Sequence, residues 1–275
     1  MNYQLGLIGY PLGHSLSPKI HAAALKACEL DGNYSLFPIP PDDKQGLKDL
    51  LARVRSGEIH GLNVTIPHKQ NVIEFMDELT PTAQAIGAVN TIYMRDNKLI
   101  GDNTDAPGFL SDLKKVNKET STQVSRPAIV LGAGGSARAV LYALLNDGWN
   151  VTIAARRIEQ AQQLASSFTN YQLQVADFSA FSIHHSSLLV NTTPLGMTPN
   201  TEASPLPENM VLSKNTFVYD LVYNPRETKL VRDARAQGLN ASTGLGMLIE
   251  QAALAFEKWT GHNPPRDVLY QAVES

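Results

Sequence analysis

Short apolar runs alternate with longer amphipathic segments along almost the whole chain. Runs rich in Val, Ile, Leu and aromatic residues have the length of strands, whereas apolar residues that recur every three or four positions indicate helices. We predict strands at residues 5–8, 34–39, 62–66, 89–94, 98–101, 128–131, 150–154, 188–191 and 217–221. We predict helices at residues 17–28, 43–55, 159–168, 228–237, 247–259 and 266–273, another from about residue 136, and a further helical stretch after residue 69. Repeated strand–helix units with short loops predict an α/β protein whose mostly parallel sheets are covered on both faces.

Three local signals refine this pattern. Ser17-Pro18 opens its helix with a residue that favours the N-cap and a proline that favours the first turn. Asp96-Asn97 favours a tight turn between two predicted strands, which would make that pair a hairpin and the one antiparallel feature. The polar segment 114–126 lacks apolar periodicity, so we expect a surface connection there before the pattern restarts at Ala128.

Composition places the chain among packed globular proteins. Of 275 residues, 43% are hydrophobic and 18% are charged, which argues against extensive disorder. The net charge of −3 indicates no basic surface for nucleic acid or anionic lipid. Cys28 is the single cysteine and cannot form an internal disulfide. The N-terminal residues lack the basic segment of a signal peptide, and no stretch approaches about 18 consecutive apolar residues, so we expect a cytoplasmic protein.

The most specific local signal is a glycine-rich turn between a predicted strand and a predicted helix. In A-I-V-L-G-A-G-G-S-A-R, Gly132 and Gly134 precede Ala137 at the spacing typical of dinucleotide-binding proteins. The glycines let backbone N–H groups approach a pyrophosphate, which the helix N-terminus then stabilises. An ordinary tight strand–helix turn is the alternative.

The end of the following strand bears on which nucleotide is bound. NAD sites usually place an acidic residue there, which binds the ribose 2′-hydroxyl. Ala155 takes that place in this chain, and Arg156 and Arg157 follow it. Two guanidinium groups beside the ribose favour a 2′-phosphate, so we predict NADP(H), with merely solvated arginines as the alternative.

Polar residues at the ends of predicted elements suggest a substrate pocket. Reduction of a carbonyl builds negative charge on oxygen, so a cation or proton donor has to stand nearby. In N-V-T-I-P-H-K, Asn63 and Thr65 alternate with apolar residues, and Lys69 follows the proline that ends the strand. The other candidates are Ser15, Ser17, Asn90 and Asp105.

Each of these residues also has a plain structural interpretation. Ser17 and Asp105 could cap helices, and Asn90 could belong to a turn. Together they predict a pocket rich in hydroxyls and amides that suits a small polyhydroxylated ligand, with Ser15 and Ser17 placed for its carboxylate. The seven histidines show no spacing typical of metal ligands, so we predict no metal site.

Seven segments, taken together, resemble shikimate dehydrogenases and occur in that family's order. They are S-L-S-P-K-I-H, N-V-T-I-P-H-K, G-A-V-N-T-I, G-D-N-T-D-A-P-G, G-A-G-G-S-A-R, N-T-T-P-L-G-M and G-L-G-M-L-I-E-Q-A. The resemblance implies NADPH-dependent reversible reduction of 3-dehydroshikimate to shikimate, on the route to chorismate and the aromatic amino acids.

We therefore expect two α/β domains. Residues 1–105 with 241–275 would form the substrate domain, and residues 106–240 a Rossmann-type NADP-binding domain. A cleft between the domains would hold both ligands, with hinges near Asp105 and Ser242.

The resemblance also implies roles for individual residues. Lys69 and Asp105 would form the catalytic pair, with Lys69 either donating a proton to the developing alkoxide or stabilising it by charge. The substrate would contact Ser15, Ser17, Asn63, Thr65, Lys69, Asn90, Asp105, Tyr223 and Gln251. NADP would contact Gly132, Ala133, Gly134, Gly135, Ser136, Ala155, Arg156, Arg157, Thr192, Leu221, Gly244 and Met247.

Two positions depart from the family's pattern. Ala155-Arg156-Arg157 stands where the family commonly has Asn-Arg-Thr, which removes an amide contact to the ribose or phosphate that Arg157 could replace. Gln160 stands where the family usually has an arginine.

Two other functions stay open at this point. A quinate/shikimate dehydrogenase would use NAD or accept both acids, and the lack of an acidic residue at Ala155 argues against NAD. A non-catalytic sensor of NADPH or of a shikimate-like acid could lose the lysine or the aspartate, yet this chain keeps both. The expected partner is a small-molecule substrate rather than nucleic acid or a membrane, and a homodimer is the candidate assembly.

Overall fold

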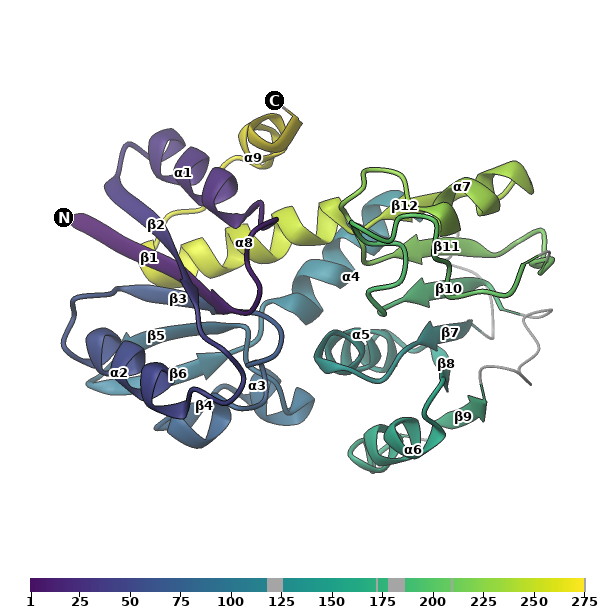
Figure 1. Ribbon diagram of the computed structural model, residues 1–275, viewed down its shortest axis with the longest axis horizontal. Helices are drawn as coiled ribbons and strands as arrows, with labels where there is room; N and C mark the ends of the chain where they lie inside the picture. Colours follow the sequence, from purple (N-terminus) through teal and green to yellow (C-terminus); the bar gives the residue numbers. More distant parts are fainter. Residues whose placement is uncertain (118–125, 172, 178–185, 209, 275) are drawn as a thin grey trace. The chain divides into compact units, whose positions relative to one another are not determined.

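The computed structural model describes residues 1–117, 126–171, 173–177, 186–208 and 210–274. The chain divides into two compact units, Met1–Gly108 with Ile249–Ser275, and Phe109–Leu248. Both crossings between the units lie inside helices, namely α4 (Asp105–Val116) and α8 (Leu245–Thr260). Each unit contains one six-stranded sheet in its described residues (Figure 1).

The sheet of the first unit is mixed. Its strands are β1 (Asn2–Gly9), β2 (Asp31–Pro38), β3 (Gly61–Val64), β4 (Glu78–Leu79), β5 (Thr91–Arg95) and β6 (Lys98–Asp102), in the order β2-β1-β3-β5-β6-β4. The predicted β5–β6 hairpin is confirmed, and Asp96 and Asn97 in its turn have positive φ of 52° and 60°. It is not the one antiparallel pairing, because β5 also runs antiparallel to β3.

Helices cover both faces of this sheet. They are α1 (Ser17–Ala27), α2 (Lys44–Arg55), the short 3₁₀ helix η1 (Ile73–Phe75), α3 (Pro81–Ile86), α9 (Arg266–Glu274) and the C-terminal part of α8. Residues Leu47 and Leu50 of α2 pack with Leu62 and Val64 of β3 in one buried cluster. Figure 1 shows α1 and α9 together on the other side of the sheet from α2.

Gly61 allows α8 to pack closely against that other face. A Cβ at Gly61 would lie 2.3 Å from the indole of Trp259, so only glycine leaves room for this ring. Trp259 Nε1 then donates a hydrogen bond to the carbonyl of Ile92 at 3.1 Å. The same face of the sheet presents Asn63, two residues further along β3.

The sheet of the second unit is parallel throughout its described pairs. Its strands are β7 (Pro127–Leu131), β8 (Asn150–Ala155), β9 (Gln174–Asp177), β10 (Leu188–Asn191), β11 (Phe217–Asp220) and β12 (Ala241–Thr243). The order is β12-β11-β10-β7-β8-β9, and its helices are α5 (Gly135–Asn146), α6 (Ile158–Ser166) and α7 (Lys229–Ala236). Strand order reverses between β7 and β10, and ligands of such doubly wound sheets bind at that switch point, beyond the carboxyl ends of the strands.

Some elements differ from the sequence-based expectation. The short strands β4, β9 and β12 were not predicted, because two to four residues carry too little periodicity. The strand expected to reach Ile66 ends at Val64. The second crossing lies after Leu248 rather than near Ser242, because β12 still pairs with β11 in the second sheet. Residues 118–125 of the expected surface connection lie outside the described residues.

Candidate active site

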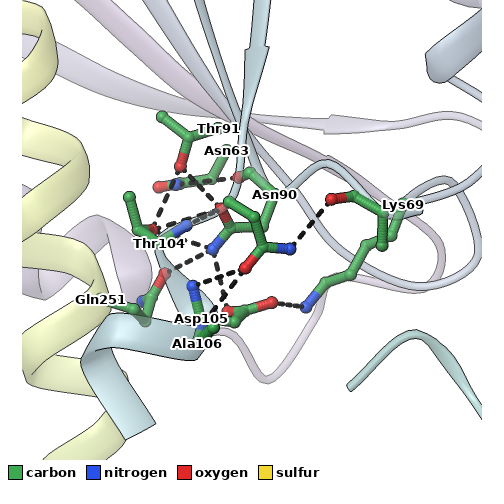
Figure 2. Close-up of polar contacts among 10 residues, drawn as sticks. Asn63, Lys69, Asn90, Thr91, Thr104, Asp105, Ala106 and Gln251 are labelled. Atoms are coloured by element: carbon green, nitrogen blue, oxygen red, sulfur yellow. Dashed lines mark hydrogen bonds and ion pairs between the residues drawn. The ribbon is translucent and has the colours of Figure 1, made fainter. Parts of the chain in front are cut away.

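Lys69 and Asp105 meet in the first unit. Lys69 lies in the turn region that follows β3, and Asp105 is the first residue of α4. Lys69 Nζ lies 2.5 Å from Asp105 Oδ2, and the two side chains are only 12% and 6% exposed. Figure 2 shows the lysine side chain extended toward the carboxylate. The structure therefore joins an ammonium group and a carboxylate, 36 residues apart in sequence, in a largely dry setting.

Asn90 is the centre of the polar network around this pair. Its side-chain oxygen accepts hydrogen bonds from the backbone N–H of Thr104 at 2.7 Å and from the hydroxyl of Thr91 at 2.9 Å. Because a backbone N–H can only donate, these bonds fix which end of the amide carries the nitrogen. Asn90 Nδ2 is thereby directed to Asp105 Oδ1 at 2.9 Å and to Gln251 Oε1 at 3.3 Å.

Asn103 fixes the position of Asp105. The Asn103 side-chain oxygen accepts from the backbone N–H groups of Asp105 at 3.1 Å and Ala106 at 3.3 Å. Its side-chain nitrogen donates to the carbonyl of Ala88 at 3.0 Å. Asn103, rather than Asp105, therefore satisfies the start of α4, and the Asp105 carboxylate is left for Lys69 and Asn90.

Gln251 reaches the cluster from α8. A Cβ at Gly108 would lie 2.8 Å from the Gln251 backbone nitrogen, so the glycine lets α4 and α8 approach closely. In Figure 2 Gln251 enters from the helix on the left, whereas Lys69 enters from the right. The glutamine is thus part of the same network as the lysine, although 182 positions separate them in sequence.

The two serines lie at the start of α1. The backbone N–H of Ser17 donates to Ser15 Oγ at 3.2 Å, and the N-cap position belongs to Leu16. Ser17 is therefore not the side-chain cap that the sequence suggested. Its side chain is buried beside Tyr34, whose hydroxyl donates to Asn63 Oδ1 at 2.8 Å.

Asn63 and Thr65 differ in their burial and in their side-chain hydrogen bonds. Asn63 is 5% exposed, and its side-chain nitrogen donates to the carbonyl of Asn90 at 3.2 Å. Thr65 is half-buried, and its hydroxyl has no hydrogen-bond partner within the part of the chain that the structure describes. The Thr65 hydroxyl is thus available to a ligand.

The glycine-rich turn lies at the switch point of the second unit. Gly132 has a φ of +110°, and its N–H donates to the carbonyl of Ala154 at 2.8 Å. A Cβ at Gly132 would lie 2.6 Å from Thr192 Oγ1, which itself donates to the carbonyl of Leu131 at 2.7 Å. The turn is thus fixed against the ends of both β8 and β10.

The outer side of this turn fits an anionic group. Gly134 is the N-cap of α5 and gives that helix no side-chain cap. A Cβ at Gly134 would meet no atom within 4 Å, so the space in front of the first helical turn is open. Free N–H groups and the positive end of the helix dipole at such a place stabilise a phosphate.

The end of β8 carries exposed positive charge. Arg156 and Arg157 are both exposed and have no ion-pair partner among the described residues, while Ala155 is buried. A carboxylate does lie near this strand end, because Ala155 pairs with Asp177 of β9. Sequence analysis missed Asp177, since β9 was not predicted.

The remaining residues predicted to contact NADP lie around the end of β11. A Cβ at Gly244 would lie 2.2 Å from the carbonyl oxygen of Leu221, so these two backbones pack directly together. Met247, in the first turn of α8, is buried, and burial raises the pKa of Tyr223 in the loop after β11.

Asp220 fixes the start of that loop. Its carboxylate accepts from Thr228 Oγ1 at 2.6 Å and Asn191 Nδ2 at 2.8 Å. Burial raises the pKa of Asp220 to about 6, and these hydrogen bonds oppose the shift.

The sequence-predicted residues thus form two groups. Asn63, Lys69, Asn90, Asp105 and Gln251 make one continuous network in the first unit, and Ser17 lies beside Tyr34, which donates to Asn63. Tyr223 lies in the second unit with the residues predicted to contact NADP.

Five members of the first network were missed by sequence reasoning. They are His21, Tyr34, Thr91, Asn103 and Thr104. The spacing of Ser17 and His21, four residues apart in a predicted helix, was the available signal for His21.

The described residues contain neither a metal-binding cluster nor a membrane-spanning helix. No group of three or more His, Cys, Asp or Glu side chains there is placed to hold a metal ion. No helix there is long and apolar enough to span a membrane.

Comparison with known proteins decides the family. Three family models match successive parts of the chain: the shikimate dehydrogenase substrate binding domain at residues 7–92, shikimate / quinate 5-dehydrogenase at 114–227, and the shikimate 5′-dehydrogenase C-terminal domain at 244–274. A shikimate dehydrogenase (NADP(+)) of Salinibacter ruber is 41% identical over 98% of this chain and 96% of its own length. The chain belongs to the shikimate dehydrogenase family.

Solved structures of this family share the fold along the whole chain. Shikimate 5-dehydrogenase from Thermus thermophilus, in complex with NADP(H) and shikimate, matches with a TM-score of 0.88 and 38% identity, over 99% of this chain and 98% of that one. Quinate dehydrogenase from Corynebacterium glutamicum, in complex with NAD, matches with a TM-score of 0.90 and 30% identity, over 100% of this chain and 99% of that one. The expected α/β class, with a Rossmann-type second unit, is confirmed for this member of the shikimate dehydrogenase family.

Proposed function

We propose that this chain catalyses the NADPH-dependent, reversible reduction of 3-dehydroshikimate to shikimate, in the biosynthesis of chorismate and the aromatic amino acids. The observation that carries the proposal is the buried Lys69–Asp105 pair within a network of amides and hydroxyls. Membership of the family and the NADP(+)-dependent relatives support the choice of substrate and cofactor.

We propose that the first unit holds the substrate. Carboxylates and amides that accept and donate in fixed directions suit the hydroxyl groups of a cyclic polyol acid. Asp105, Asn90, Gln251, Asn63 and Thr65 would contact those hydroxyls. Ser15 and Ser17, at the start of α1, would bind the carboxylate. Tyr223 would also contact the substrate.

In this proposal Lys69 interacts with the oxygen of the reacting carbonyl. NADPH, when bound, supplies a hydride to the carbonyl carbon, and the oxygen then needs one proton to become a hydroxyl. The Lys69 ammonium either gives that proton and later recovers one from solvent, or stabilises the alkoxide by charge while solvent water supplies the proton. Asp105 keeps the ammonium in place through the 2.5 Å contact and accepts from the substrate hydroxyl.

We propose that the second unit holds NADP. The open space before α5 and its uncapped first turn fit a pyrophosphate, contacted by Gly132, Ala133, Gly134, Gly135 and Ser136. Arg156 and Arg157 fit a 2′-phosphate as charge-assisted donors beside Ala155. The nicotinamide end would be bordered by Thr192, Leu221, Gly244 and Met247.

The direct test is a spectrophotometric assay of shikimate-dependent NADP⁺ reduction. We expect turnover with shikimate and NADP⁺, and much weaker turnover when NAD⁺ replaces NADP⁺. The quinate/shikimate alternative predicts comparable turnover with quinate or with NAD⁺, and it is favoured by the likeness to the Corynebacterium quinate dehydrogenase. Comparison of kcat/KM for the four acid–nucleotide pairs separates the two.

A non-catalytic sensor would bind NADPH or shikimate and give no turnover with any pair. Calorimetric binding measured beside the assay identifies that outcome. The expected cytoplasmic location and homodimer stay predictions, which cell fractionation and light scattering would test.

A further inference from the structure

His21 is a buried polar group for which the proposed chemistry has no role so far. It lies on α1, one helical turn after Ser17, and is 0% exposed. Its ring stacks on Tyr34 with centroids 4.3 Å apart and an interplanar angle of 6°, and Trp259 lies 5.3 Å away. Burial lowers the pKa of His21 to about 3, so the ring is neutral at neutral pH.

The hydrogen bonds of Asn63 determine which nitrogen of His21 carries the hydrogen. Asn63 Nδ2 donates to the carbonyl of Asn90, which can only accept, so Asn63 Oδ1 must face the other way. That oxygen lies 3.1 Å from His21 Nε2 and 2.8 Å from the Tyr34 hydroxyl. Because the oxygen can only accept, His21 Nε2 must carry the hydrogen.

The other ring nitrogen is then a buried acceptor. A neutral imidazole has a single N–H, so Nδ1 holds a lone pair. Nδ1 is fully buried and has no hydrogen-bond partner among the described residues. An unsatisfied polar atom in a core is destabilising, and an aromatic residue such as phenylalanine would avoid it. Phenylalanine, however, could not supply the hydrogen-bond donor that His21 has at Nε2.

The Tyr34 hydroxyl has one hydrogen and two neighbours. It donates to Asn63 Oδ1, and the Ser17 side chain lies beside it. While Tyr34 donates to Asn63, its oxygen can only accept from the neighbouring Ser17 hydroxyl. A Ser17 hydroxyl that donates to a bound carboxylate can only accept from Tyr34, which allows the tyrosine hydrogen to turn from Asn63 to Ser17. His21 is the second donor that keeps Asn63 Oδ1 hydrogen-bonded at that moment.

We propose that His21 is a positioning residue: its Nε2–H holds the Asn63 amide and frees the Tyr34 hydroxyl to follow Ser17 when the carboxylate of the substrate binds. Asn63 is linked through Asn90 to Asp105 and Lys69. The bond from His21 to Asn63 therefore also helps to hold these proposed substrate contacts in position. This inference rests on the proposed function.

Steady-state kinetics of His21→Phe and His21→Gln tests the proposal. Phenylalanine keeps the aromatic packing and removes the donor, whereas glutamine can place an N–H close to the position of Nε2. We expect His21→Phe to raise the KM for shikimate about tenfold or more, the scale of one lost buried hydrogen bond. The KM for NADP⁺ should change less than about twofold, and His21→Gln should recover most of the loss.

A double-mutant cycle with Asn63→Ala shows whether the effect passes through Asn63. We expect His21→Phe to change the shikimate KM little in the Asn63→Ala background. His60→Phe is the matched control, because His60 accepts from Gln4 N–H in the same unit but outside this network, and it should leave the shikimate KM unchanged.

Three outcomes would overturn the proposal. They are an unchanged shikimate KM in His21→Phe, equal rises in both KM values, and additive effects in the cycle. If His21→Phe does not fold, the shikimate KM of His21→Gln decides alone, with a rise of about tenfold counting against the positioning role. An unmodified protein that shows no turnover at all would instead refute the proposed function, so the two failures are distinguishable.

Discussion

Lys69 Nζ and Asp105 Oδ2 lie 2.5 Å apart, yet their surroundings are unequal. Asp105 also accepts from Asn90 Nδ2 at 2.9 Å and lies in the first turn of α4, where the helix dipole favours negative charge. For Lys69, Asp105 is the one anionic partner among the described residues. The carboxylate is thus held by several groups, and the ammonium by a single carboxylate.

This asymmetry predicts unequal losses of stability. Asp105→Asn leaves a largely buried ammonium opposite a neutral amide, which should lower the free energy of unfolding by up to about 3 kcal/mol. Lys69→Met should cost clearly less, because the carboxylate keeps Asn90 and the helix terminus. Urea denaturation of both variants measures the difference, and an equal or larger loss in Lys69→Met would contradict this assignment.

Gly134 offers a change that separates folding from nucleotide binding. Its φ of −89° and ψ of −170° suit any N-cap residue, and a side chain there meets no atom within 4 Å. Gly134→Asp should cap α5 and leave the melting temperature unchanged or higher. The same carboxylate should repel the pyrophosphate and raise the KM for NADPH about tenfold or more.

Two companion variants control for this result. Gly134→Ser adds a cap without charge and should weaken NADPH binding less. Gly132→Ala should instead destabilise the fold, because its φ is +110° and its Cβ would lie 2.6 Å from Thr192 Oγ1. Normal NADPH binding by Gly134→Asp would show that the pyrophosphate does not lie at this turn.

The two arginines after β8 should set the preference for NADPH. Arg156→Ala or Arg157→Ala should raise the KM for NADPH roughly tenfold, the scale of one hydrogen bond to a charged group. The KM for NADH, which lacks the 2′-phosphate, should stay within about twofold. Arg232→Ala, an exposed arginine on α7, is the control. Equal losses with both nucleotides would count against a phosphate contact.

His21 should make stability depend on pH. Its pKa falls from 6.5 to about 3 in the folded protein because of burial. The unfolded chain therefore binds a proton first as the pH falls, so the stabilising contribution is present above about pH 6.5 and is lost progressively toward pH 3. The folding equilibrium constant should fall at least about tenfold from pH 7 to pH 5 through this group.

Denaturation of the unmodified protein and of His21→Phe at several pH values isolates this contribution. Other groups titrate equally in both proteins. The difference between their free energies of unfolding should therefore change with pH as the titration of His21 requires. A difference that does not change between pH 7 and pH 5 would mean that the ring is not buried as a neutral group.

Much of the fold follows from local patterns in the sequence. The strands β7 and β8 and the amphipathic helix α2 were predicted within one or two residues, because each carries its own local pattern. The β5–β6 hairpin followed from its turn. In contrast, β12 has three residues and is defined by pairing with β11, which no local pattern contains. Helix α4 was obscured by Pro107 and Gly108 in its first turn.

In the candidate site, too, local sequence patterns predict some residues, whereas others are recognised only from their contacts in the fold. Lys69, Asn90 and Asp105 were predicted because polar residues at the ends of apolar runs stand out. His21 and Tyr34 were missed because their importance comes from a shared contact with Asn63, across α1, β2 and β3. The helix start at Asp105 shows the same limit, since only the structure reveals that Asn103 accepts from its N–H.

In the proposed mechanism the Lys69 ammonium acts on the oxygen of the reacting carbonyl. The most direct measurement is the kcat of Lys69→Ala for shikimate-dependent NADP⁺ reduction, with Lys48→Ala, an exposed lysine on α2, as the control. We predict that kcat of Lys69→Ala falls by about a thousandfold or more, while shikimate and NADP⁺ still bind and Lys48→Ala keeps normal turnover. A Lys69→Ala variant with near-normal kcat would contradict the account.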